Sequence, residues 1–450
     1  MTRCIVLLDG EHYPPVLRAA LARAHEHDYE VVGAVFAGGY EKLTGNFDVG
    51  IPVVSAERPS GWHEQRGALE LAISRFTPDV VLDISDAPVV DEQRRLQLAA
   101  VAVARGVGYR GADFLIEPPR RPRVVTAPSV AVIGSGKRVG KTAVGAHLAR
   151  LIIADGLRPV VVAMGRGGPL QPQLVRGDEI RPDVRALLEV SALGGHAASD
   201  FYEDAVMAGV ATVGACRAGA GLAGAPYDDT VAAAVEVANG LNPDVTILEG
   251  SGTAIPPVAA DATVLVLRAG DIPHGFGIYR VLLADMVVVT MAEEPTASPR
   301  DLSALSSSLK TLVGDVVCVR TVFRPHPVEP VRGKTIFYAT TAPETVSEKL
   351  IAHLENIHGA RVAGISHRLG DRSGLQLDLE KATGSYEVLV TELKAAAVDT
   401  AARIARENGT PVVFADNALE AVDGDVDGAL AKAVRSARER YAQFGQKESR

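Results

Sequence analysis

The segment that most restricts how this chain can fold is a glycine-rich loop at residues 134–142, which reads GSGKRVGKT. An apolar run at 130–133 precedes the loop, and a helical pattern at 143–154 follows it. A strand, a glycine-rich loop and a helix in this order build a P-loop, where backbone N–H groups and the helix dipole bind phosphate oxygens. We therefore expect a nucleotide-binding α/β domain. A glycine-rich turn with a chance Gly-Lys-Thr triplet is the alternative, but it leaves the flanking strand and helix unexplained.

Individual loop residues have distinct expected roles. Lys141 would neutralise the β- and γ-phosphate oxygens of ATP, and the Thr142 hydroxyl would hold Mg²⁺. Thr290 follows a later apolar run, and it either borders the nucleotide base or simply ends its strand. The expected nucleotide-binding residues are Gly134, Ser135, Gly136, Arg138, Val139, Gly140, Lys141, Thr142 and Thr290.

Short Val/Ile-rich runs alternate with helical patterns along the chain, which indicates βαβ units and mostly parallel sheets. We expect a three-layer α/β/α fold with a Rossmann-like N-terminal domain at residues 1–117 and a central P-loop domain at 124–332. A second Rossmann-like domain is expected at 333–450, where it would complete the substrate site. Residues 118–123 read PPRRPR, and these prolines and arginines favour an extended, solvated linker.

Composition excludes several classes of protein. The 450 residues carry a net charge of −9, which argues against a general nucleic-acid coat. No apolar stretch reaches the roughly 18–20 residues that cross a bilayer, and Asp9 interrupts the first apolar run too early for a signal peptide. The three cysteines include no CxxC pair, so neither a disulfide framework nor a zinc site is supported. We expect a cytoplasmic protein without nucleic-acid or membrane partners.

The spacing within the loop departs from the common P-loop pattern. Five residues instead of four separate Gly134 from Gly140, a gap that resembles that of dethiobiotin synthetase. A later strand ends in Glu-Gly-Ser-Gly from Glu249 onward, similar to the Glu-Gly-x-Gly of that enzyme, and a carboxylate there can bind Mg²⁺. The resemblance implies a P-loop domain of the dethiobiotin-synthetase type. It also implies that Arg166 contacts the transferred phosphoryl group and that Asp200 is a metal ligand, although Arg166 could be an exposed loop residue.

Further motifs are spread over the entire chain. They read LDGEHYPPV at 8–16, HAASDFYED at 196–204, FRP at 323–325, GK at 333–334, ATTA at 339–342, TELKAAAVD at 391–399 and FADN at 414–417. Together they resemble the cyclic 2,3-diphosphoglycerate synthetase family. The resemblance implies a ligase that uses ATP and Mg²⁺ to close 2,3-bisphosphoglycerate into a ring through a phosphorylated intermediate, with release of ADP and phosphate. It further implies that the product is a compatible solute, and related P-loop ligases imply a homodimer.

Such a substrate would need many cations, because it brings two phosphates and a carboxylate beside ATP and like charges repel strongly in a low-dielectric site. We expect Lys141, Lys137 and Arg166 to act on the transferred phosphate. Lys394 stands at the expected start of a helix at 394–407, where the helix dipole disfavours a cation unless an anion is bound. Each further cation could be a solvated surface residue, but domain crevices favour ligands. The candidate substrate-binding residues are His12, His196, Arg268, His274, Arg324, Lys334 and Lys394.

Two other classes of function remain open at this point. A dethiobiotin-synthetase-like ligase or a phosphoglycerate kinase would use the same loop on another substrate. A nucleotide-switched scaffold, such as a partitioning ATPase, often carries an extra lysine just before a Gly-Gly pair in its loop. Here Lys137 precedes Arg138 and Val139, which disfavours the switch.

Overall fold

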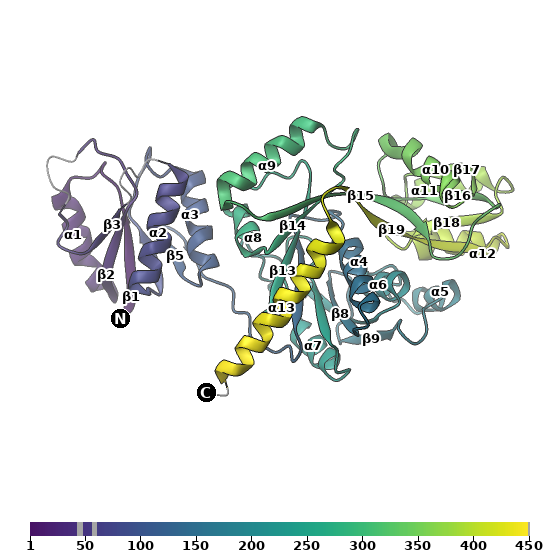
Figure 1. Ribbon diagram of the computed structural model, residues 1–450, viewed down its shortest axis with the longest axis horizontal. Helices are drawn as coiled ribbons and strands as arrows, with labels where there is room; N and C mark the ends of the chain where they lie inside the picture. Colours follow the sequence, from purple (N-terminus) through teal and green to yellow (C-terminus); the bar gives the residue numbers. More distant parts are fainter. Residues whose placement is uncertain (43–47, 56–60, 449–450) are drawn as a thin grey trace. The chain divides into compact units, whose positions relative to one another are not determined.

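The computed structural model describes residues 1–42, 48–55 and 61–448 of the chain. It confirms the expected α/β fold class, with parallel-rich sheets in two compact units (Figure 1). The N-terminal unit contains Met1–Arg120 together with Ile272–Leu283 and Ala304–Val316. The second unit contains Arg121–Asp271, Ala284–Ser303 and Val317–Arg450. Two stretches of the expected P-loop segment 124–332 therefore belong to the N-terminal unit.

The N-terminal unit has a six-stranded sheet in the order β3-β2-β1-β4-β5-β6, parallel except for the β5–β6 pair. The strand order reverses between β1 and β4, because the chain first builds outward through β2 and β3 and then returns to the other side of β1. Its strands are β1 (Thr2–Leu8), β2 (Tyr29–Phe36), β3 (Val53–Ser55), β4 (Val80–Asp83), β5 (Gly108–Arg110) and β6 (Leu115–Ile116). Its helices are α1 (Pro14–Ala24), η1 (His25–His27), α2 (Trp62–Phe76), α3 (Glu92–Ala104), η2 (Gly275–Gly277) and α8 (Ile278–Leu283).

Late segments of the chain complete this first unit. Helix α3 packs against both η2 and α8. The indole N–H of Trp62 and the guanidinium of Arg66 both donate to the carbonyl of Leu312, at 3.1 and 2.7 Å, although more than 240 residues separate the partners. Leu312 lies in α9 (Pro299–Val313). The N-terminal unit is thus assembled from three separate stretches of sequence.

The second unit is built on a 13-stranded sheet in the order β11-β10-β8-β12-β7-β13-β14-β15-β19-β18-β16-β17, with β9 beside β10. Strands β8, β12, β7, β13 and β14 are parallel and buried on both faces, which explains their continuous Val/Ile runs. The central strands are β7 (Ser129–Gly134), β8 (Pro159–Gly165), β9 (Gln173–Arg176), β10 (Ala211–Ala218), β11 (Asp228–Asp229), β12 (Val245–Glu249), β13 (Ala262–Arg268) and β14 (Met286–Thr290). The accompanying helices are α4 (Lys141–Ala154), α5 (Val184–Ala192), α6 (Asp200–Ala208), α7 (Val231–Asn239) and α13 (Val426–Glu448), which crosses β7 and β13 (Figure 1).

The sheet continues into the C-terminal domain through a long antiparallel pair, β15 (Val317–Pro327) and β19 (Val412–Asp423). Beyond it lie β18 (Val388–Glu392), β16 (Thr335–Ala339) and β17 (Arg361–Ser366), all parallel. The expected helix at 394–407 is shorter in the structure, because Ala395 has a φ of 49° and turns the chain after Lys394. The helical segments here are η3 (Glu344–Val346), α10 (Ser347–Asn356), α11 (Arg372–Ala382), the π-helix η4 (Ala397–Ala402) and α12 (Arg403–Glu407).

Candidate active site

The glycine-rich loop connects β7 to α4 and has the expected strand–loop–helix context. Gly140 precedes α4 with a φ of 96°, and a Cβ at this position would lie 2.2 Å from Cζ of Phe323, so only glycine fits. The Lys141 ammonium lies inside the loop, where it donates to the carbonyls of Gly136 at 2.7 Å and Gly252 at 3.2 Å. Burial lowers the pKa of Lys141 to about 8. The loop therefore holds its lysine preorganised, with the N-terminus of α4 open to an anion.

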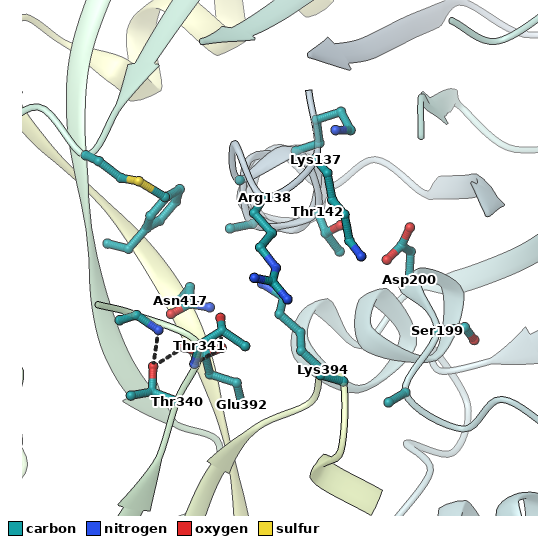
Figure 2. A pocket seen from close by; sticks show the side chains of 18 of the residues that line it. Lys137, Arg138, Thr142, Ser199, Asp200, Thr340, Thr341, Glu392, Lys394 and Asn417 are labelled. Carbon is teal, nitrogen blue, oxygen red and sulfur yellow. Dashed lines mark hydrogen bonds between the residues drawn. The ribbon is translucent and has the colours of Figure 1, made fainter. Parts of the chain in front are cut away.

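A cavity of about 410 Å³ opens in front of this loop, within the size range of small-molecule sites. Lys137, Arg138 and Thr142 of the P-loop, Asp200 of α6 and Lys394 of the C-terminal domain surround one hollow (Figure 2). The loop after β8, which contains Arg166, and the nearby His196 also line it. Its lining thus combines the nucleotide loop with a wall from the C-terminal domain.

Acidic side chains form a buried cluster behind the P-loop. Helix α6 contributes Glu203 and Asp204, and β12 ends at Glu249; all three are at most 4% exposed. Burial raises the pKa of Glu203 and of Glu249 to about 8, and it raises that of Asp204 as well. Nζ of Lys394 lies 3.1 Å from Oε1 of Glu203, and neighbouring carboxylates together with this pairing raise the pKa of Lys394. Lys394 is therefore held as a cation at the edge of an acidic interior.

The carboxyl group of Glu249 packs against α4. A Cβ on Gly145 would lie 1.9 Å from Oε1 of Glu249, so the glycine makes room for this carboxylate. In the described part of the chain, Oε1 of Glu249 and both carboxylate oxygens of Asp204 have no hydrogen-bond partner. Glu249 does not line the cavity, whereas Thr142 and Asp200 do.

Magnesium has a plausible set of protein donors here. The Thr142 hydroxyl and the Asp200 carboxylate are oxygen ligands of the kind that Mg²⁺ prefers, and the buried Oε1 of Glu249 lies against α4 without a hydrogen-bond partner among the described residues. Among residues 1–42, 48–55 and 61–448, no group of three or more His, Cys, Asp or Glu side chains could hold a metal ion. Two protein oxygens suit Mg²⁺, because this ion usually keeps several waters and binds phosphates of the substrate.

The wall from the C-terminal domain is held by two polar networks. Glu392 is 2% exposed and accepts from the Thr340 hydroxyl at 2.5 Å, the Thr341 hydroxyl at 2.6 Å and the Thr341 N–H at 3.1 Å (Figure 2). Arg324 donates to both carboxylate oxygens of Glu293, at 2.6 and 3.0 Å. The first network fixes the turn that faces the P-loop, and the second neutralises the charge of Arg324.

Several sequence-predicted residues lie elsewhere. Thr290 is fully buried and donates to the Val139 carbonyl at 2.8 Å, so it supports the P-loop from behind instead of facing a base. Arg268 pairs with Asp271 three residues further on, at 2.9 Å. His274 and His12 belong to the N-terminal unit, and Lys334 is exposed outside the cavity. The sequence-predicted residues that line the cavity are Lys137, Arg138, Gly140, Lys141, Thr142, Arg166, His196, Asp200, Arg324 and Lys394.

Sequence reasoning assigned no role to the buried acids around Lys394. Glu203 and Asp204 lie in the motif HAASDFYED, and Glu392 lies in TELKAAAVD. A usable signal was present, since two carboxylates stand inside a nine-residue helix whose other residues are mostly apolar. Thr340 and Thr341 face the cavity from the motif ATTA.

Comparison with known proteins places all three regions in one family. Family profiles described as cyclic 2,3-diphosphoglycerate synthetase match residues 3–117 as its N-terminal domain, 129–322 as its P-loop domain and 327–418 as its C-terminal domain. The cyclic 2,3-diphosphoglycerate synthetase of Rubrobacter xylanophilus is 43% identical over 97% of this chain and 98% of its own length. That of Methanothermus fervidus is 39% identical over 97% of both chains. The solved structure of LpxK from Aquifex aeolicus in complex with ATP covers 71% of this chain and 91% of its own, with 13% identity and a TM-score of 0.42.

Proposed function

Because this chain belongs to the cyclic 2,3-diphosphoglycerate synthetase family, we propose that it converts 2,3-bisphosphoglycerate and ATP into cyclic 2,3-diphosphoglycerate, ADP and phosphate. The observation that supports this most is the composition of the cavity. Five cations that line it are Lys137, Arg138, Lys141, Arg166 and Lys394. Of these, Lys394 forms an ion pair with Glu203, which holds it in place. Two polyanions can be brought together only where such a set offsets their repulsion.

The reaction requires two displacements at phosphorus. An oxygen of one substrate phosphate attacks the γ-phosphorus of ATP, and the bond from that phosphorus to the β–γ bridging oxygen breaks, so that ADP leaves. An oxygen of the other substrate phosphate then attacks the activated substrate phosphorus. The bond to the newly added phosphate breaks, inorganic phosphate leaves, and a P–O–P bond closes the ring. The attacking phosphate oxygens are already ionised, and each leaving group departs as an anion that needs no proton, so catalysis consists mainly of positioning and charge stabilisation.

The P-loop side of the cavity would bind and polarise the nucleotide. Lys141 and Lys137 would contact the transferred phosphate, and the guanidinium of Arg166 would assist with two parallel hydrogen bonds. Thr142 and Asp200 would hold Mg²⁺, which when bound neutralises phosphate charge. Glu249, whose carboxyl group packs against Gly145 of α4, would support the ion from outside the cavity. Substitution of any of these residues is expected to lower ATP turnover.

The opposite side of the cavity would bind the bisphosphate. Lys394, fixed by Glu203, would meet one substrate phosphate, and His196 lies on the same lining. The Thr340–Thr341 turn, ordered by Glu392, presents polar groups for the substrate carboxylate or the second phosphate. This division places the two polyanions on facing walls of a single cavity.

The experiment that tests the proposal follows phosphorus directly. The protein is incubated with ATP, Mg²⁺ and 2,3-bisphosphoglycerate, and ³¹P NMR should show a cyclic pyrophosphate signal together with one ADP and one phosphate per ring. Lys141→Ala should abolish all three signals, whereas Arg268→Ala, which lies outside the cavity, should retain them. ADP release without a ring signal would instead support a kinase or a ligase for another substrate.

We further propose that the enzyme works as a cytoplasmic homodimer without nucleic-acid or membrane partners and that its product serves as a compatible solute. These proposals rest on the family resemblance and on the acidic net charge of −9. No helix in the described residues is long and apolar enough to cross a membrane. Sedimentation equilibrium of the purified chain tests the homodimer, since a monomer at micromolar concentration would contradict it.

A further inference from the structure

The N-terminal unit has a cavity of its own, of about 460 Å³, at the carboxyl ends of β4 and β5, with His12 from the loop after β1. Strands β1 and β4 are parallel neighbours, with Leu7 opposite Asp83, and the strand order of the sheet reverses between them. In open α/β sheets, a reversal of this kind opens a crevice at the carboxyl ends of the strands, and ligands bind there. The position of the cavity therefore indicates a ligand site in this unit.

Two buried carboxylates hold the basic groups of this cavity: Asp83, the last residue of β4, lines it, and Asp9, which follows β1, pairs with the lining residue His12. Asp9 is fully buried; it accepts from the backbone N–H groups of Glu11 and Asp86 and from Nδ1 of His12 at 2.7 Å. Asp83 accepts from Nε of Arg95 at 2.7 Å and from the Tyr109 hydroxyl at 2.7 Å. Each carboxylate thus orients one basic side chain towards the cavity and ties two loops together.

The basic groups retain hydrogen-bonding capacity that the described residues do not use. His12 directs Nδ1 to Asp9, which leaves Nε2 available, and Arg95 uses Nε and Nη2 on Asp83 and the Ser85 carbonyl, which leaves Nη1. Arg110, at the end of β5, is exposed and also lines the cavity. Two guanidinium donors and one imidazole nitrogen, from three elements, line this cavity, and together they form a set that suits a phosphate group.

The rim of the cavity carries acidic groups as well. Asp86 and Asp113 line it, and Asp113 is exposed. A second anion would be repelled there, whereas hydroxyl groups of a ligand can donate to these carboxylates. A compact molecule with one phosphate and neighbouring hydroxyls therefore matches both parts of the lining.

We propose that the N-terminal unit holds a second binding site, for a small hydroxylated phosphate monoester, in which His12, Arg95 and Arg110 bind the phosphate and Asp113 accepts a hydroxyl. The site is made entirely by residues of the N-terminal unit, and no residue of it lines the cavity of the P-loop. It needs neither ATP nor Mg²⁺, and it is independent of the cyclisation reaction.

Calorimetric titration of the full-length protein without ATP or Mg²⁺ tests this site. The probes are sn-glycerol 3-phosphate, inorganic phosphate and 2,3-bisphosphoglycerate. Glycerol 3-phosphate should bind most tightly at this site, because it alone combines one phosphate with free hydroxyls. Arg110→Ala and His12→Ala should each weaken its binding about tenfold, the effect of losing one charge-assisted hydrogen bond.

Matched variants show whether glycerol 3-phosphate binds in the cavity of the N-terminal unit or in the cavity of the P-loop. Arg23→Ala removes an exposed charge from α1 of the same unit and should change nothing, and Lys141→Ala should bind glycerol 3-phosphate as wild type does. Asp113→Ala should remove the preference for glycerol 3-phosphate over inorganic phosphate. The proposal is overturned if wild type binds no probe. It is equally overturned if Lys141→Ala loses glycerol 3-phosphate binding while Arg110→Ala and His12→Ala retain it.

Discussion

The close approach of α4 to Glu249 makes Gly145→Ala the most decisive perturbation of the nucleotide site. In an ordinary helix interior, replacing glycine by alanine stabilises the fold by about 0.5–1 kcal/mol, because alanine restricts the unfolded chain. At position 145 the added Cβ would lie 1.9 Å from Oε1 and 3.0 Å from Cδ of Glu249. The carboxylate is 2% exposed, so it must move within a packed interior.

Overpacking of this kind costs about 1–3 kcal/mol. That cost exceeds the helix gain, so we expect Gly145→Ala to destabilise the second unit by about 1 kcal/mol net. Displacement of Glu249 should also weaken the binding of Mg²⁺ with ATP, since a bound cation favours the ionised form of this carboxyl group and would lose its attraction. The variant should therefore lose Mg²⁺ affinity by more than it loses ATP affinity without metal.

Hydrogen exchange resolved by peptide measures the effect within each unit separately. Gly67→Ala on α2 is the matched control, because its Cβ would meet nothing within 4 Å; peptides from α2 should exchange more slowly by the ordinary helix gain. Peptides from α4 of Gly145→Ala should exchange faster. Equal protection gains in the two variants, with Mg²⁺ affinity unchanged, would refute the placement of Glu249 against Gly145.

Three further outcomes follow from the site. Burial lowers the pKa of Lys141 to about 8, so the unliganded loop loses this cation above pH 8. The Kd for ATP should therefore rise by up to about tenfold per pH unit above pH 8. In ATP titrations from pH 7 to 9, the Kd of Lys141→Arg should not change with pH. The pKa of Glu203 is raised to about 8, so Glu203 contributes stability that is full below pH 4.5 and is lost as the pH rises through 8. Lys394→Met removes the cation that pairs with Glu203 once this acid ionises, so the loss in free energy of unfolding relative to wild type should grow from pH 6 to pH 9 in urea unfolding. A loss that stays constant with pH would contradict the Lys394–Glu203 pairing. Gly140→Ala places a Cβ 2.2 Å from Cζ of Phe323 at a positive φ, and nucleotide titration should show ATP affinity lowered at least a hundredfold; near-normal affinity would mean that the loop can rearrange.

The parts of the site that could be predicted from sequence are those made by contiguous residues. The strand, loop and helix around Lys141 form one local unit, so their order and glycines were enough to place them. Arg166 also reaches the cavity because it follows the end of β8, whereas Asp200 reaches it from the N-terminus of α6. Chain order therefore carries much of the geometry wherever a parallel sheet collects its carboxyl ends at one edge.

Side-chain pairing could not be read in the same way. Arg268 follows a strand as a ligand-binding residue would, yet Asp271 three residues on satisfies it. Thr290, at the end of β14, meets the backbone of Val139 in the loop after β7, because β7 and β14 flank β13 in the sheet, a relation that only the topology determines. Lys394 lines the cavity with a partner that the sequence pattern did not reveal: Glu203, from a helix almost 200 residues earlier, lies 3.1 Å from its ammonium group.

The carbonyl of Leu312 has a consequence for how the protein is made. Trp62 and Arg66 can bind this carbonyl, and α3 can pack against η2 and α8, only after those later segments have been synthesised. The first unit therefore cannot complete its packing while only its first 120 residues have left the ribosome. Translation must proceed to about residue 316 before the earliest part of the chain is complete. A fragment cut at residue 120 would lack these partners, so the first unit can mature only after most of the P-loop segment has been translated.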